Sequence, residues 1–231
     1  MGLISFERAV CSTVFNSQSQ VLFYGNHQGA YAASAYSVAA PGSRVLAIRP
    51  IATQDPEITS WDRRYLNARQ EDFKGRFGYA PDMIEAVDKA YIIFDPRNDL
   101  DAMHSALLLK DHVIALRTPM LEDNVEKTFV DMGILETIAL KAMMGELTRF
   151  EFAKLYRKRR HNRLYLRTLS EWLINNGQET RALSVCQYIV GGGRHWPYFV
   201  RTLKRLQSQK EAQATKNKNM DHMIQDDDTA A

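Results

Sequence analysis

The segment VLFYGNHQGAYAASA, residues 21–35, joins a short apolar run to an alanine-rich run through a turn with glycine at both ends. The apolar run predicts a buried strand, and the alanine-rich run predicts a helix. Gly25 and Gly29 flank His27 and would let the backbone turn sharply, with His27 in a strained conformation. The sequence therefore predicts His27 at the carboxyl end of a strand, above the free N–H groups of a helix.

Three further apolar runs follow this turn, separated by helical patterns. The predicted strands are residues 21–24, 44–48, 90–94 and 113–116. The helices predicted between them are residues 28–39, residues 61–71, a segment after Pro81, and residues 99–109. Alternating strands and helices predict an α/β fold with a parallel sheet of four strands in sequential order, joined by right-handed crossovers.

The chain becomes more basic and purely helical after these elements. A long helix over residues 125–147 is expected to cover the second face of the sheet. We predict three parts: an α/β domain (1–148), a helical appendage (149–208), and a disordered tail (209–231) that has no apolar period. Gly177 is expected as a left-handed C-cap between two antiparallel helices.

The composition excludes several classes of protein. No apolar run approaches the roughly 20 residues of a membrane span, and the N-terminus predicts an amphipathic helix rather than a signal peptide. We therefore expect a soluble, cytoplasmic protein. Cys11 and Cys186 lie in apolar helical patterns, which favours buried reduced thiols. No metal-ligand spacing and no complete phosphate-binding motif is present, so neither a metal nor a cofactor is expected.

The turn around His27 resembles the nucleophile elbow of the α/β-hydrolases, Gly-x-Ser-x-Gly, with histidine in place of serine. The stretches GSRVLAIRP, AYIIFDPRNDLDAMHSALL and HVIALRTP resemble later strands and loops of that fold. The resemblance covers residues 5–147 and implies only the second half of the fold, because one helix alone precedes the elbow.

This resemblance implies a triad of an elbow nucleophile, an acid after the third strand and a histidine after the fourth. The acid would be Asp99, with Asp95 and Asp101 as alternatives, but residues 117–123 contain no histidine. His104 is expected as an exposed or half-buried helix residue.

Two of the three triad roles are therefore vacant. We expect a non-catalytic, hydrolase-like binding or scaffold module whose binding residues are Gly25, Asn26, His27, Gln28 and Gly29. The alternative is an atypical hydrolase of ester or acyl substrates that uses His27 with Asp99 or Asp95.

A basic stretch follows the predicted α/β domain. Its patch comprises Arg157, Lys158, Arg159, Arg160 and Arg163. Leucines continue an apolar stripe through this stretch, so a solvated helix face is favoured over contact with an acidic partner. The net charge of +3 argues against nucleic acid as a partner. Residues 164–190 resemble a single tetratricopeptide-like hairpin.

The strand at residues 21–24 is expected at the edge of the sheet, with residues 44–48 as its only neighbour. Its apolar residues would leave the open edge unprotected. A helix at residues 3–15 is expected to lie on a face of the sheet and not over this edge. We therefore predict a homodimer or a partner protein at this edge, and no membrane partner.

Overall fold

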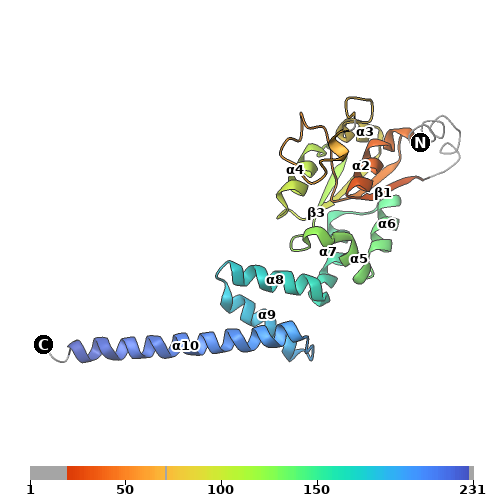
Figure 1. The fold of residues 1–231 in the computed structure, drawn as a ribbon. Helices are drawn as coiled ribbons and strands as arrows, with labels where there is room; N and C mark the ends of the chain where they lie inside the picture. Colours follow the sequence, from red (N-terminus) through yellow and green to blue (C-terminus); the bar gives the residue numbers. More distant parts are fainter. Residues whose placement is uncertain (1–19, 71, 229–231) are drawn as a thin grey trace. The chain divides into compact units, whose positions relative to one another are not determined.

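The structure, a computed structural model, describes residues 20–70 and 72–228. The chain divides into two compact units between Asn162 and Arg163. The first unit contains a parallel sheet with helices, and the described part of the second is helical (Figure 1). This arrangement confirms the predicted α/β class followed by a helical region.

The sheet has four parallel strands in the order β1-β2-β3-β4, as predicted. The strands are β1 (Leu22–Asn26), β2 (Arg44–Ile48), β3 (Lys89–Phe94) and β4 (Val113–Arg117). Val45 lies opposite Phe23 on one side and Ala90 on the other, and Ala90 lies opposite Val113. Strands β2 and β3 are buried almost throughout, whereas β1 and β4 are edge strands and partly exposed.

Helices cover both faces of the sheet (Figure 1). On one face lie α2 (Gln28–Ala35), α3 (Ala80–Met83) and α4 (Asp99–Leu107); on the other lie α5 (Val125–Asp131), α6 (Leu135–Met143) and α7 (Arg149–Tyr156). The first three belong to crossovers of one hand, which places them together. Their core is built from small and β-branched residues, including Ala30, Ala35, Val45, Ala47, Ala90 and Ile92.

The helix predicted over residues 125–147 is wrong as a single element, because α5 and α6 are separated by Gly133. Gly133 has φ 60°, its N–H donates to the carbonyl of Val130, and the N–H of Ile134 donates to the carbonyl of Phe129. This pair of hydrogen bonds forms a Schellman motif that ends α5.

The helix predicted over residues 61–71 is also wrong. The described residues there form turns, with one 3₁₀ turn, η2, at Ala68–Gln70. Side chains in this loop accept backbone hydrogen bonds two residues later: Asp55 from the N–H of Glu57, and Asp62 from the N–H of Arg64. Such local bonds compete with helix formation.

The second unit contains α8 (Arg163–Asn175), α9 (Glu179–Gly191) and α10 (Pro197–Asp228). Gly177 has φ 68° and ends α8, as predicted. Cys186 is a buried free thiol, and Cys11 lies outside the described residues, as does the predicted helix at 3–15. Helix α10 continues to Asp228, through the range expected to be disordered. No helix in the described ranges is long and apolar enough to cross a membrane.

Candidate functional site

His27 lies at the tight turn between β1 and α2, with φ 57° and ψ −117°. Its N–H donates to the carbonyl of Ile48 on β2 at 3.0 Å, which fixes the turn against the sheet. A Cβ atom on Gly25 would lie 2.0 Å from the carbonyl oxygen of Gly29, so Gly25 must be glycine. Nothing lies within 4 Å of a Cβ on Gly29, and the expectation that both glycines prevent a clash holds only for Gly25.

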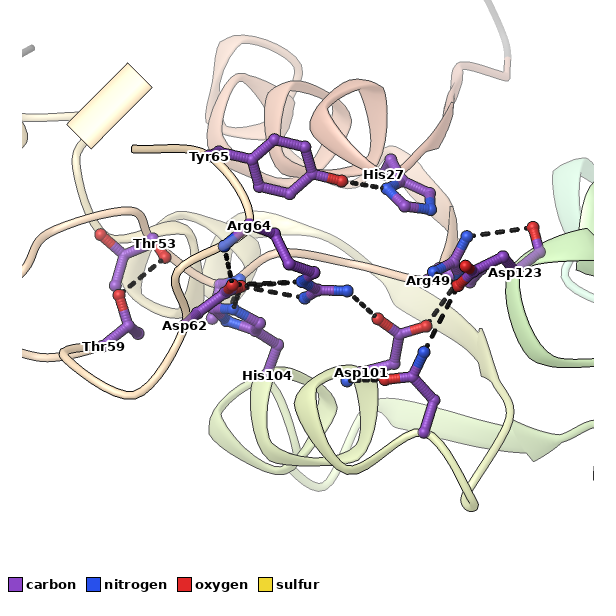
Figure 2. A network of polar contacts seen from close by, with 12 residues as sticks. His27, Arg49, Thr53, Thr59, Asp62, Arg64, Tyr65, Asp101, His104 and Asp123 are labelled. Carbon is purple, nitrogen blue, oxygen red and sulfur yellow. Dashed lines mark hydrogen bonds and ion pairs between the residues drawn. The ribbon is translucent and has the colours of Figure 1, made fainter. Parts of the chain in front are cut away.

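The imidazole of His27 is held by Tyr65, with 2.5 Å between Nδ1 and the phenol oxygen (Figure 2). Burial lowers the pKa of His27, and the charge of Arg49 lowers it further. Burial also raises the pKa of Tyr65, so its hydroxyl stays protonated and can donate to Nδ1. In the tautomer that accepts this hydrogen bond, the proton of the neutral ring is on Nε2, for which the described residues supply no hydrogen-bond partner.

Helix α2 begins directly after His27. The carbonyl of His27 accepts the N–H groups of Ala30 and Tyr31. The N–H groups of Gln28 and Gly29 donate no hydrogen bond to any described residue. Both residues are exposed, so this helix start presents free donors directly after His27 in the chain.

An ion-pair network, buried at Arg49 and Asp101, lies beside the turn (Figure 2). Asp101 is 1% exposed; its carboxylate accepts hydrogen bonds from Arg49 Nε and from a terminal nitrogen of Arg64, each at 2.6 Å. Arg49, 3% exposed, also pairs with the carboxylate of Asp123 and donates to its carbonyl at 3.0 Å. The network links β2 and α4 to the loop after β4, and it neutralises both arginines.

His104 is fully buried, contrary to the exposed or half-buried position expected for it. Its Nε2 lies 2.9 Å from Asp62, and its Nδ1 accepts the N–H of Ala52 at 3.2 Å, while Trp61 packs on the ring. Burial lowers the pKa of His104 against the opposing effect of Asp62. Burial alone would raise the pKa of Asp62, but hydrogen bonds from Arg64 and His104 hold it at about 2.

The structure does not bring the expected acids to His27. Asp95 is fully buried and accepts the backbone N–H groups of Arg97, Leu121 and Glu122 at 2.8–3.0 Å, which makes it a support for the loop after β4. Asp99 is exposed in the first turn of α4. No described carboxylate forms a hydrogen bond with His27.

Strained backbone gathers at this end of the sheet. All four non-glycine residues with positive φ in the described part of the chain follow strands β1, β2 or β4: His27, Arg49, Met120 and Glu122. Such conformations cost energy and cluster at functional sites.

Asn26, the last residue of β1, points to the opposite face from Gly25. Its amide donates to Glu126 on α5 at 2.7 Å, and the hydroxyl of Tyr24 donates to the same carboxylate. The Asn26 side-chain oxygen is buried without a partner among the described residues.

The predicted basic patch spans both compact units. Arg157, Lys158, Arg159 and Arg160 lie in a 3₁₀ turn, η5 (Arg157–His161), of the first unit, and Arg163 begins the second. The guanidinium of Arg159 lies over Tyr156, and that of Arg163 lies over Trp196. The predicted patch is therefore divided: four of its residues belong to the first unit, and Arg163 belongs to the second.

Sequence reasoning missed Tyr65, Arg49 and Arg64. Arg49 follows a predicted strand directly, and that position could have suggested it. Tyr65 and Arg64 lie in a segment predicted as a helix, so no sequence signal placed them near His27.

Within the described residues, no group of three or more histidine, cysteine, aspartate or glutamate side chains is arranged to hold a metal ion. No family model, curated protein or solved structure matches the chain. The hydrolase resemblance and the tetratricopeptide-like hairpin therefore stay predictions.

Proposed function

We propose that the α/β unit is a non-catalytic, hydrolase-like binding module that receives an oxyanion, such as a carboxylate or phosphate, at His27. The observation that carries this proposal is the contact between Tyr65 and Nδ1: with the phenol as donor, Nε2 carries the ring proton and has no partner among the described residues. The free N–H groups of Gln28 and Gly29 add two donors at the same helix start. Together these three donors suit the acceptor oxygens of an anion.

Catalysis is disfavoured because the candidate carboxylates already have partners. Asp101 is held by two arginines, and Asp95 by three backbone N–H groups. A histidine base is normally oriented by an acid, and here that role is filled by a neutral phenol.

The second candidate is an atypical hydrolase of ester or acyl substrates. The lowered pKa of His27 favours it, since an unprotonated imidazole can act as a nucleophile near neutral pH. The N–H groups of Gln28 and Gly29 would then stabilise the developing oxyanion.

Turnover of p-nitrophenyl acetate separates the two candidates. We expect wild type and His27→Ala to release p-nitrophenol at the same rate, because exposed histidines alone supply the background. His27→Ser should stay at that rate, since no base is available to activate the serine. Saturable turnover by wild type that His27→Ala abolishes would establish the hydrolase and refute the binding module.

A scaffold role also has a candidate surface, the side of β1 that pairs with no described strand. Strand β1 is at the edge of the sheet, and its residues Leu22 and Phe23 are half-buried. We propose that a second copy or a partner protein pairs here. Light scattering over a dilution series tests self-association: the mass should fall on dilution, and a monomer at every concentration would exclude the second copy.

A further inference from the structure

A groove of about 590 Å³ opens between the edge strand β4 and helix α7. None of its lining residues belongs to the network around His27. Its volume falls in the range of roughly 300–1,000 Å³ that is typical of small-molecule sites. Its lining includes Leu116, Arg117, Arg149, Phe152, Tyr156 and Arg159.

The groove has a rigid apolar wall. The rings of Phe152 and Tyr156 stack with centroids 5.7 Å apart, and both meet Phe129 edge-on at 6.0 and 6.3 Å. The hydroxyl of Tyr156 donates to the carbonyl of Pro119 at 3.0 Å, which ties α7 to the loop after β4. The wall is therefore formed before any ligand arrives.

The charged residues of the groove are all arginines. Arg117, Arg149 and Arg159 line it, and no acidic residue does. Arg117 and Arg149 are exposed, and neither forms an ion pair or a side-chain hydrogen bond with any residue in the described ranges. The guanidinium of Arg159 lies 4.3 Å from the centroid of the Tyr156 ring. Positive charge beside an apolar wall selects a ligand with an anionic head and an apolar body.

We propose that this groove binds a small amphipathic anion: an acyl chain or aromatic ring that carries a carboxylate or a phosphate. The apolar body lies against Ala115, Pro119 and Ala153, the lining residues with exposed apolar surface, and the anionic head pairs with Arg117 and Arg149. Single-stranded nucleic acid fits less well, because base stacking needs open aromatic faces. Phe152 and Tyr156 are each only 4% exposed.

Calorimetric titration of the full-length protein tests this proposal with octanoate and octyl phosphate as probes and 1-octanol as the neutral control. Both anions should bind, and 1-octanol should bind at least about tenfold more weakly. Arg117→Gln and Arg149→Gln should each weaken octanoate binding by about tenfold, since each removes a charged hydrogen bond. Both side chains are exposed, so the variants should keep the unfolding midpoint of wild type.

Arg63→Gln is the matched control, because Arg63 is an exposed arginine of the same unit that does not line the groove. It should bind octanoate as wild type does. The proposal is overturned if 1-octanol binds as tightly as octanoate, if the Arg117 and Arg149 variants bind like wild type, or if neither anion binds at millimolar concentration. Tight binding of oligo-dT without binding of octanoate would also overturn it, in favour of nucleic acid. The groove is separated from the elbow by repeating the octanoate titrations in the His27→Ala background, where Arg117→Gln and Arg149→Gln should still weaken binding by about tenfold.

Discussion

The arginines at the carboxyl end of the sheet and those in the groove beside β4 belong to the same unit but are in opposite electrostatic situations. Arg49 and Arg64 are bound by carboxylates, whereas Arg117 and Arg149 have no acidic partner in the described part of the chain. Paired charges cancel and fix the loops that carry them. The elbow is therefore left with directional N–H donors, while the groove retains net positive charge.

Removing the carboxylate that Arg49 and Arg64 share should have the largest effect on stability. Asp101→Asn leaves Arg49 and Arg64 without their shared buried carboxylate, and we expect the free energy of unfolding to fall by about 3–5 kcal/mol in urea denaturation. Asp99→Asn, an exposed neighbour on α4, is the control and should cost less than about 1 kcal/mol. Equal effects of the two substitutions would show that the network does not stabilise the fold.

The turn itself offers a second contrast, between its two glycines. Gly25→Ala should destabilise the protein by about 3 kcal/mol, because the added Cβ meets the backbone of Gly29 at 2.0 Å. Gly29→Ala has open space and lies in a helix, so it should be neutral or stabilise by up to about 1 kcal/mol. Urea denaturation of both variants measures this difference. If Gly25→Ala left the free energy of unfolding unchanged, the turn would have room for a Cβ atom at this position.

The buried histidine gives the stability a pH dependence. The pKa of His104 is lowered by burial below its ordinary value of 6.5, so the unfolded chain takes up a proton first as the pH falls. Stability should therefore decrease as the pH falls below about 6.5, by up to about 1.4 kcal/mol per pH unit for each such histidine. His27 has the same direction of shift and adds to the slope.

The double variant His27→Ala/His104→Gln should remove most of this slope between pH 7 and pH 5. Denaturation midpoints measured across that range test the assignment. A slope as steep as that of wild type would place the titrating groups elsewhere.

Local patterns in the sequence were sufficient to predict the sheet. The four apolar runs gave the strands and their order, and the two glycines around His27 gave the turn. They also predicted the edge position of β1. Gly133 carried a usable signal too, since glycine often ends a helix, but the apolar stripe on both sides of it suggested one continuous helix.

The surroundings of His27 could not be predicted in the same way. Arg49 and Asp101 are 52 positions apart in the sequence, and Tyr65 reaches His27 across 38 positions. The contact between Tyr65 and His27 depends on how the loop between β2 and α3 folds back over the sheet. Side-chain hydrogen bonds in that loop override its helical pattern, and sequence periodicity does not report them.

The most direct test of the account is the protonation state of His27, measured by long-range ¹H–¹⁵N NMR of the histidine rings at pH 7, with His27→Ala for assignment. We predict a neutral ring with the proton on Nε2, whose resonance shifts when inorganic phosphate is added. Tyr65→Phe should weaken the preference for that tautomer. A charged imidazolium, a proton on Nδ1, or an Nε2 resonance that does not respond to phosphate would contradict the claim that His27 presents a donor to an anion.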